Sequence, residues 1–564
     1  MPPKPQGRQR VRKACVSCQQ KKRKCNGLEP CDTCDGYGFD CYYHSATNPI
    51  EENMGRPRTS SKRTSAAVST RDLNTADTPQ VNTRKRARHD FLEPNKSRYV
   101  GTGSAISFPL KLSRDMGAVD LPRLHSYAWN AGTRPEAIPS FTPQVVQLVR
   151  YEDLHALTSV YFEVVHPVFG VIDKADFTLR CVEHWMGDSQ SLGFDALVGS
   201  VCALGSLFAG NGRFAGEVDL VKATKILLDN ISTIHGATED FVVAWILRSL
   251  YLRSTTRPHA SWMSTCSTMH IIEAVGLHRE IGTTFISSNS ARMSTPYHKF
   301  PELRRRIFWT AKALNLMFSC EYGRSPIHLD EVNCEEPAAV DGDRTTELIA
   351  LAKLMSVNAM TSREVLEESL AKMSEACSSC PLLILMRANA SFCIYRRLCL
   401  YDPGPSREYL TNIMKMGEDA LLPAQTLVLS HQVWWDVLAV PFHYICVLLH
   451  INSFESLSLL SVAMSGLRRI TRHLGTHMAK EAESTASSLI SVCSQRKQRE
   501  MHCLTAQLSV ESESDPLQHD LQLQADELQN RTPLPEWLYD IVPGWDCQPN
   551  SSSTESHLGM APNR

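Results

Sequence analysis

Apolar residues recur at helical spacing through most of the chain beyond about residue 140. Two predicted helices each carry one apolar face: Leu154, Leu157, Tyr161, Val164 and Val165 on the first, and Leu303, Ile307, Ala311, Leu314 and Phe318 on the second. Side chains three and four positions apart lie on one side of a helix, and the alternation typical of strands is scarce. The pattern predicts a large all-α domain over residues 140–505, with Thr142 as N-cap and Pro143 as first helical residue.

Residues 43–139 show little of this periodicity. Most of this range is rich in Ser, Thr, Asn, Pro and Arg and contains few large apolar side chains. Such a segment cannot bury enough apolar surface to offset the entropy lost on ordering. It is predicted to be a largely disordered linker. Residues 42–100 also lack the heptad repeat of apolar positions that forms a coiled coil.

Length and charge refine this picture. The chain has 564 residues, and its 43% hydrophobic content can fill a large core, so at least two structural units are expected. The net charge of -1 conceals an uneven distribution, because residues 1–100 contain 20 Lys and Arg against 10 Asp and Glu, and the remainder contains 39 against 50. The N-terminal part therefore suits a polyanionic partner, and the rest does not.

The N-terminus is polar and basic and lacks the apolar core of a secretory signal peptide. The most apolar later stretch, residues 437–451, is shorter than a membrane span and follows Asp436. We therefore expect a soluble protein without a membrane partner. Its cysteines are expected in a reducing compartment, where metal ligation or catalysis is more usual than a disulfide framework.

Six cysteines near the N-terminus repeat one spacing, C-x2-C-x6-C: Cys15, Cys18 and Cys25, then Cys31, Cys34 and Cys41. An ordinary zinc site would use four of them, but the repeat argues that all six act together. Two tetrahedral Zn(II) ions need eight ligand positions, so two sulfurs must bridge both ions. By the symmetry of the repeat these are Cys15 and Cys31. The alternatives are a zinc site that serves protein contacts and a thiol redox centre.

The spacing C-x2-C-x6-C-x5-C-x2-C-x6-C, with a basic first loop and Pro30 before the fourth cysteine, resembles the zinc binuclear cluster DNA-binding domain of fungal transcription factors. All six cysteine positions match. The resemblance places this domain at residues 14–42, after a basic arm at 1–13. It implies two Zn(II) ions bridged by the first and fourth cysteines, in agreement with the symmetry argument. It also implies a short helix through the second cysteine that points into the major groove of DNA.

The two loops of the repeat differ in charge. The first is QQKKRK and the second is DGYGFD, so only the first suits phosphates and the acceptor edge of guanine. The family resemblance implies that Lys22, four residues after the second cysteine, reads a CGG-type triplet, with Lys21 as a secondary contact. Phosphate contacts are predicted for four further residues: Arg23, Lys24, Arg12 and Lys13.

A single triplet supplies only about 3 to 9 kcal/mol of discrimination, so a second half-site or partner is expected. Because no coiled coil is predicted, either the helical domain forms a homodimer or the protein binds as a monomer with help from its basic flanks. The linker contains a basic run that is a candidate nuclear import signal or phosphate-contacting arm: Arg84, Lys85, Arg86 and Arg88. A nuclear location is expected, since a DNA-binding regulator must reach its target.

The predicted helical domain carries a second resemblance. Residues 161–177, 273–282 and 302–329 are similar, in that order, to the regulatory middle homology domain of the same fungal factors. Residues 97–103, SRYVGTG, look like the segment that often precedes that domain. Asn315 and Ser325 depart mildly from the family pattern. The resemblance implies a packed array of helices with a regulatory role.

Several residues of this domain could be taken for functional groups. Arg304 to Arg306 are predicted to form two internal salt bridges and one solvated side chain rather than a second DNA-binding patch. Core or capping roles are favoured over a ligand pocket for three others: His166, His278 and Arg279. Cys377 and Cys380 form a lone CSSC, which in a reducing compartment is a weak signal for metal or redox use. Trp434 and Trp435 are predicted to be core residues.

The predicted tail, residues 506–564, changes character again. Residues 511–546 contain nine acidic residues and one basic residue, interleaved with leucine, tryptophan, tyrosine and isoleucine. This composition is typical of an acidic-hydrophobic activation segment that binds a coactivator. A C-terminal amphipathic helix docked on the helical domain is an equally good interpretation of the pattern.

Together these features predict a mostly α protein with a small zinc cluster domain, a linker and a large regulatory domain. The expected function is sequence-specific regulation of RNA polymerase II genes, as an activator of a metabolic or secondary-metabolite pathway. The alternatives are a DNA-bound repressor or scaffold, and an enzyme with a zinc-stabilised accessory module. The enzyme is disfavoured because the sequence lacks GxxxxGK[ST], HExxH and GxSxG motifs, and because a binuclear cluster leaves no open position at which zinc could activate water.

Overall fold

The computed structural model describes the chain in parts. These are residues 14–20, 25, 90–93, 98–101, a few positions between 104 and 117, 143–280 without 188–190, 235–237 and 256–257, 284–286, and 301–509 without 356–361 and 402–403. The chain divides into two units, residues 1–84 and 85–564. The element described in the first unit is the short helix α1 (Val16–Gln20).

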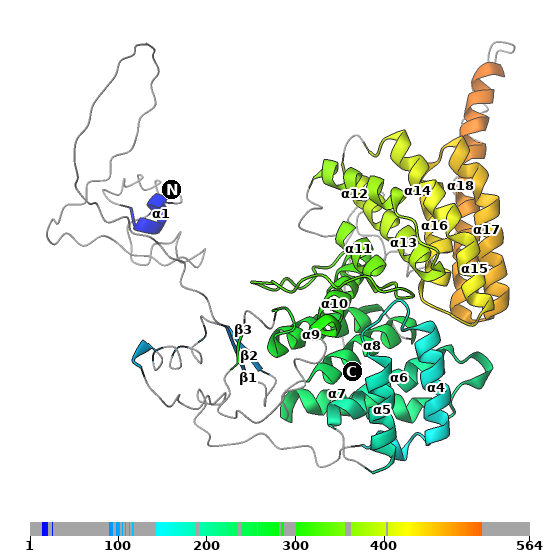
Figure 1. The fold of residues 1–564 in the computed structure, drawn as a ribbon. Coiled ribbons are helices and arrows are strands. Elements are labelled where there is room, and N and C mark those ends of the chain that lie inside the picture. The colour runs from blue at the N-terminus through cyan, green and yellow to red at the C-terminus, as the bar shows by residue number, and fades with distance from the viewer. Residues whose placement is uncertain are drawn as a thin grey trace, which may run out of the picture. The chain divides into compact units, whose positions relative to one another are not determined.

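The second unit is built mainly of helices (Figure 1). The described helices are α4 (Tyr151–Val164), α5 (Lys174–Trp185), α6 (Leu192–Phe208), α7 (Glu217–Ile234), α8 (Glu239–Thr255), α9 (Pro258–Val275), α10 (Pro301–Glu321), α11 (Thr345–Leu354), α12 (Arg363–Glu375), α13 (Pro381–Leu398), α14 (Arg407–Asp419), α15 (Leu421–Leu429), α16 (Asp436–Ile451), α17 (Phe454–Leu474) and α18 (His477–Ser509). The mostly α prediction is confirmed.

One continuous apolar core runs through this helical array. Helix α6 is buried along nearly its whole length and packs against α4, α7 and α8. In the later half, α16 packs against α13, α17 and α18. Helix α10 joins the two halves, because it contacts α9 as well as α11 and α13 (Figure 1).

The two apolar faces predicted from the sequence lie in this core. The buried members are Leu154, Leu157, Tyr161, Val165, Ile307, Ala311, Leu314 and Phe318, and the half-buried ones are Val164 and Leu303. Helices α4 and α6 approach closely at Gly205, where a Cβ atom would overlap the carbonyl oxygen of Leu157. Glycine inside a helix costs about 1 kcal/mol relative to alanine, so its use here reflects the lack of space.

Several helices begin at a side chain that satisfies a backbone N–H of the first turn. Asp173 accepts from the N–H of Asp176 at the start of α5, and Ser191 accepts from that of Phe194 at the start of α6. Helix α17 begins with a reciprocal capping box, in which Ser453 and Ser456 each accept from the other's backbone N–H. Such caps provide partners for N–H groups that have none within the helix.

The start of the domain differs from the prediction. Thr142 lies outside the described residues, and Pro143 precedes a turn of 3-10 helix, η2 (Val145–Gln147), rather than opening α4. Helix α4 begins at Tyr151, after the extended residue Arg150. The physical reason is burial, because η2 packs against α6 and places Val145 and Val149 in the core before the long helix starts.

A small three-stranded sheet adds to the helices. It consists of β1 (Asp90–Glu93), β2 (Arg98–Val100) and β3 (Thr284–Ile286) in the order β2-β1-β3. Strand β1 pairs antiparallel with β2 and parallel with β3. Two of these strands fall within residues 43–139, predicted to be largely disordered. Their partner β3 is almost 200 residues away, so local composition could not reveal the pairing.

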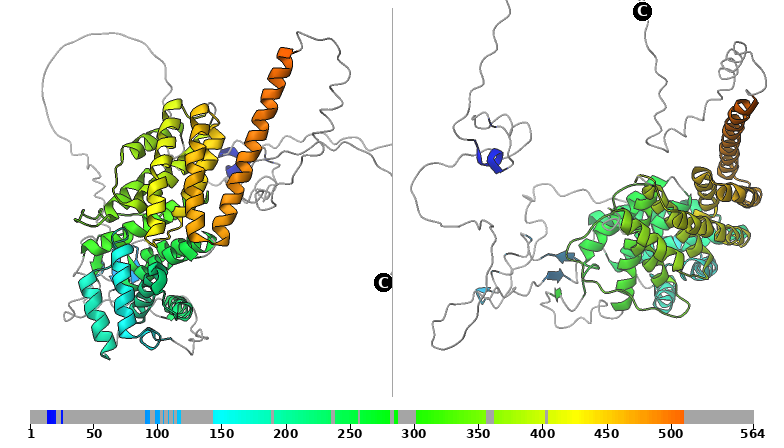
Figure 2. Two further views of the ribbon diagram at one scale, coloured as in Figure 1. Left: turned by 90° about the vertical axis from the view of Figure 1, so that its right-hand side faces the viewer. Right: turned by 90° about the horizontal axis from the view of Figure 1, so that it is seen from above.

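Helix α18 extends well beyond the helices on which it packs (Figure 2). It has 33 residues and ends at Ser509, four residues past the predicted end of the domain. Its first half is anchored through Ala479, Ala486 and Ile490, whereas most side chains from 491 onward are exposed. Among the helices that the structure describes, none combines the length and apolar character needed to cross a bilayer.

Candidate metal centre and nucleic-acid interface

Three of the predicted zinc ligands lie together in the first unit. The sulfur atoms of Cys15, Cys18 and Cys25 all lie within 4.8 Å of one another, which is close enough for all three to bind one ion. Cys15 and Cys18 are buried and Cys25 is half-buried. Sulfurs that bind one tetrahedral zinc ion through Zn–S bonds of about 2.3 Å must lie about this close to one another.

Helix α1 holds two of these sulfurs in place. Cys15 directly precedes the helix and Cys18 lies within it, so the three-residue spacing directs both side chains to the same side. The backbone N–H of Cys18 donates to the Cys15 sulfur at 3.4 Å, and that of Cys15 donates to the Cys25 sulfur at 3.5 Å. Donors aimed at sulfur favour the thiolate form that metals require. The helix also agrees with the one that the family resemblance implied through the second cysteine.

The other predicted residues of this unit lie outside the described residues. They are the ligands Cys31, Cys34 and Cys41, the predicted DNA contacts Lys21, Lys22, Arg23, Lys24, Arg12 and Lys13, and the nuclear import candidate Arg84, Lys85, Arg86 and Arg88. The described geometry therefore covers one half of the cysteine repeat.

Two family models match the chain. The fungal Zn(2)-Cys(6) binuclear cluster domain matches residues 13–49, and the fungal specific transcription factor domain matches residues 158–526. This chain belongs to the fungal zinc binuclear cluster transcription factors. The family prediction made from the cysteine spacing and the helical segments is confirmed. The members of this family are zinc-binding, DNA-binding regulators of transcription rather than enzymes, and they are generally nuclear.

Relatives from three fungi cover most of the chain. Protein RDR1 of Saccharomyces cerevisiae is 37% identical over 89% of this chain and 92% of its own length. Transcription factor kojR of Aspergillus flavus is 34% identical over 88% of this chain and 86% of its own length. A Schizosaccharomyces pombe protein named "Probable transcriptional repressor C1348.12" is 23% identical over 75% of this chain and 93% of its own length. No solved structure matches the chain.

The arginine run of the transcription factor domain is internal. Arg304 pairs with Glu239 at the start of α8, and Arg306 pairs with Asp343 and donates to the carbonyl oxygen of Ala338 at 3.1 Å. The predicted internal salt bridges are therefore present. The third arginine differs from the prediction of a solvated side chain.

That third residue, Arg305, contacts Glu280 at 2.8 Å and Glu335 at 2.6 Å. All three guanidinium groups thus connect α10 to neighbouring segments, and the run is not arranged as a DNA-binding patch. Apart from Glu302, which lies 3.7 Å from Arg305 one helical turn away, these partners could not be foreseen because they lie between 25 and 65 residues away in the sequence.

Residues of this domain that were predicted to have core or capping roles make packing contacts. His166 packs against the ring of Phe162, and burial lowers the pKa of His166 to about 4. His278 is buried and packs edge-on against Tyr99 of β2, with ring centroids 4.7 Å apart. Through this contact, the tyrosine of the SRYVGTG segment covers a histidine of the helical domain. Trp434 is a fully buried core residue.

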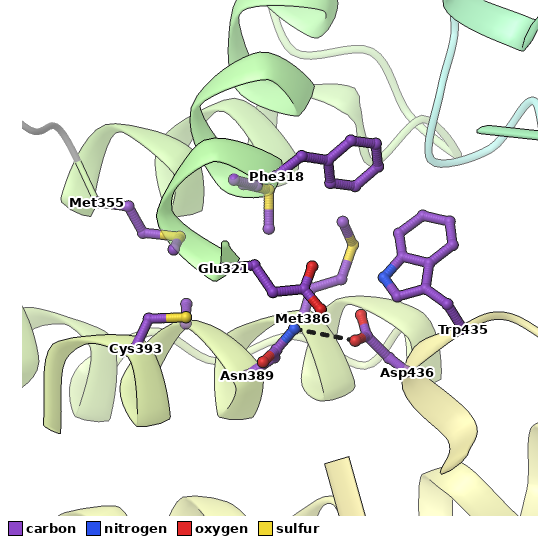
Figure 3. Close-up of a pocket in the computed structure, with 10 residues that line it drawn as sticks. Phe318, Glu321, Met355, Met386, Asn389, Cys393, Trp435 and Asp436 are labelled. Atoms are coloured by element: carbon purple, nitrogen blue, oxygen red, sulfur yellow. Dashed lines mark hydrogen bonds between the residues drawn. The ribbon is translucent and has the colours of Figure 1, made fainter. Parts of the chain in front are cut away.

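A buried charge cluster, not recognised from the sequence, lies where the two halves of the transcription factor domain meet. It consists of Arg253 on α8, Glu321 on α10, Asn389 on α13 and Asp436 on α16. Arg253 contacts Glu321 at 2.5 Å. The Asn389 amide donates to Asp436 at 3.0 Å, as Figure 3 shows. These residues are separated by about 50 to 70 positions, so no sequence motif marks them.

The surroundings of the cluster are mainly apolar. Figure 3 shows a small cavity with room for about one water molecule, lined by Glu321, Asn389 and Asp436 together with methionine, cysteine and aromatic side chains. The Arg253 guanidinium lies 5.3 Å from the ring centroid of Trp435. One guanidinium thus faces two buried carboxyl groups. Burial raises the pKa of Asp436, the Glu321 carboxylate raises it further, and Arg253 and Asn389 lower it, which places it at about 7.

Proposed function

We propose that this chain is a nuclear, sequence-specific regulator of RNA polymerase II genes that recognises CGG-type triplets through a two-zinc, six-cysteine cluster. The observation that carries the proposal is the convergence of three cysteine sulfurs on one side of α1, at the first three positions of the six-cysteine spacing. Membership of the family supplies zinc and DNA binding. The number of zinc ions, the triplet that is recognised and the direction of regulation go beyond family membership and are proposed for this chain.

In the proposed cluster, the first ion would be held by the three described cysteines, of which Cys15 is one bridging ligand, and by Cys31 as the other bridging ligand. Cys15, Cys18 and Cys25 provide three thiolates, and Cys31 completes the tetrahedron. The second ion takes Cys34 and Cys41 with the shared pair. Six thiolates then fill eight positions, and neither ion keeps an open site. The bound ions supply rigidity rather than reactivity, because the segment has almost no apolar core of its own.

Helix α1 presents the basic loop in this proposal. Gln19 and Gln20 end the helix, and the run KKRK follows directly. We assign base recognition to Lys22 with Lys21 beside it, and phosphate contacts to the remaining four basic residues named above. Lysine pairs with the O6 and N7 acceptors of guanine in the major groove, and phosphate contacts add affinity without sequence information. The run Arg84–Arg88 is the proposed nuclear import signal.

The acidic tail supports activation as the direction of regulation. A coactivator would bind its apolar residues, which the acidic residues keep in water. The Schizosaccharomyces pombe relative, which is named as a probable transcriptional repressor, favours repression as the second candidate. Fusing residues 506–564 to a foreign DNA-binding domain distinguishes the two, because an activation segment raises reporter expression and a tail without that capacity does not.

Zinc analysis and duplex selection test the cluster. We expect two zinc ions per full-length chain, and loss of zinc in Cys18→Ser but not in Cys377→Ser, which removes an exposed cysteine of the helical domain. Selection from a random duplex pool should recover CGG-type triplets and their spacing. One zinc per chain, or recovered duplexes without a common triplet, would contradict the proposal.

Replacing Lys22 with Ala should cost about 1 to 3 kcal/mol of binding free energy and relax the preference for the triplet. Replacing Lys24 with Ala should weaken binding to all duplexes alike and reduce its salt dependence. Fluorescence anisotropy with cognate and scrambled duplexes measures both effects. An unchanged cognate-to-scrambled ratio in Lys22→Ala would show that another residue reads the triplet.

A further inference from the structure

In the part of the chain that the structure describes, the projecting half of α18, residues 491–509, carries a partly to largely exposed continuation of the face that anchors the first half. At 100° per residue, Cys493, Lys497, Met501 and Leu504 fall on the same side of the helix as the buried Ala479. Met501 is 64% exposed and Leu504 is 66% exposed. We call these four residues the distal face. Exposed apolar side chains that continue a buried helix face are a candidate interaction surface.

The charges around the distal face select the kind of occupant. Lys497 lies within the face and Arg496 flanks it, whereas Arg499 lies on the opposite side of the helix. The acidic residue of this stretch, Glu500, is shared between Arg496 at 2.9 Å and Lys497 at 3.5 Å. The projecting half therefore has an excess of positive charge. A second copy of this helix packed in parallel would bring like charges together at the same positions, which is unfavourable.

The chain itself supplies a segment of opposite charge. Residues 511–546 begin directly after α18 and contain nine acidic residues and one basic residue, with leucine and aromatic side chains between them. The projecting half is about 27 Å long at about 1.5 Å per residue, a length that about ten extended residues can retrace. The match to the fungal specific transcription factor domain also continues to residue 526, beyond the end of α18.

We propose that residues 511–546 dock on the distal face of α18 and thereby cover the apolar residues that would bind a coactivator. Acidic side chains of the tail pair with Lys497 and its neighbours, and leucine or aromatic side chains cover Met501 and Leu504. Because the tail is attached to the helix, its effective concentration at this surface is in the millimolar range, so weak individual contacts suffice. The consequence for activation rests on the proposed activating role of the tail, whereas the docking itself does not.

The docking is tested on the full-length protein by hydrogen exchange and by zero-length cross-linking of amines to carboxyl groups. We expect the amides of 491–509 to exchange more slowly in the full chain than in a chain truncated after Ser509. We also expect a cross-link from Lys497 to an acidic residue of 511–546 within one chain. Met501→Asp with Leu504→Asp should abolish both signals.

Val492→Asp is the matched control, because Val492 is 50% exposed and lies on the opposite side of α18 from Met501. It should preserve the protection and the cross-link. If the double variant keeps both signals, or if it instead converts a dimer to a monomer in light scattering, the proposed occupant is wrong.

A reporter measurement separates this inference from the proposed function. With docking present and the tail active, the double variant should raise reporter expression above that of the native chain, and Val492→Asp should not. If the tail activates nothing when fused to a foreign DNA-binding domain, the activating role fails, while hydrogen exchange still decides the docking. If the tail activates but the amides of 491–509 exchange as slowly in the double variant as in the native chain, the docking fails and the activating role stands.

Discussion

Asp436 offers the sharpest test of the buried charge cluster. Replacing it with Asn removes the titrating carboxyl but keeps the size of the side chain and an oxygen that can accept from the Asn389 amide. An ordinary aspartate has a pKa of 3.8, and burial beside Glu321 raises that of Asp436 to about 7. A raised pKa means that folding favours the protonated acid, so ionising the carboxyl in the folded state costs stability.

The direction with pH follows from proton linkage. Between about pH 4 and pH 7 the folded state binds the proton at this position more tightly than the unfolded state, so the contribution of Asp436 to stability declines as pH rises. The pKa difference of about three units corresponds to up to about 4 kcal/mol, lost in full above about pH 7. The protonated acid at low pH resembles the amide, so the variant should match the native chain near pH 4.

The assay is urea unfolding of the full chain at several pH values between 4 and 8. The informative quantity is the difference in unfolding free energy between Asp436→Asn and the native chain, because the buried His166, with its lowered pKa, destabilises the fold at acid pH in both proteins equally. This difference should be near zero at pH 4 and should favour the variant increasingly up to pH 8.

Asp219→Asn, which changes an exposed carboxyl on α7, is the control and should give no such trend. A difference for Asp436→Asn that is constant across the range, or that grows as pH falls, would refute the assignment of a raised pKa to this carboxyl.

Three further predictions concern packing, ion pairing and metal. Gly205→Ala should destabilise the domain by about 1 to 3 kcal/mol in urea unfolding because its methyl group overlaps the α4 backbone, whereas Gly404→Ala has open space and should be nearly neutral. Arg306→Ala should cost about 3 to 5 kcal/mol because it leaves the largely buried Asp343 carboxylate without its partner, and Arg150→Ala, at an exposed pair, should cost less than about 1 kcal/mol. Removing zinc with a chelator should abolish duplex binding in anisotropy while leaving the helical circular dichroism of residues 143–509 nearly unchanged, and a parallel loss of helix would contradict the separation into two units.

The sequence by itself determined the family and the helical class of the large domain, and it predicted six zinc ligands. The cysteine spacing could be interpreted directly because metal geometry constrains residues that lie close together in the chain. The apolar faces of α4 and α10 were likewise predicted correctly, because helical periodicity is a local property of the sequence. The start of α4 was not, since the burial of Val145 and Val149 in a preceding turn depends on the surface of α6.

Only the tertiary structure decided which distant residues meet. The partners of Arg304, Arg305 and Arg306, the pairing of β1 with β3, and the meeting of Arg253, Glu321 and Asp436 all join segments separated by tens to hundreds of residues. No periodicity connects such positions, because their proximity results from how whole helices pack. The distal face of α18 also depends on the tertiary structure. The helical spacing of its residues can be seen in the sequence, but the point along α18 at which the neighbouring helices stop covering it is a property of the folded domain.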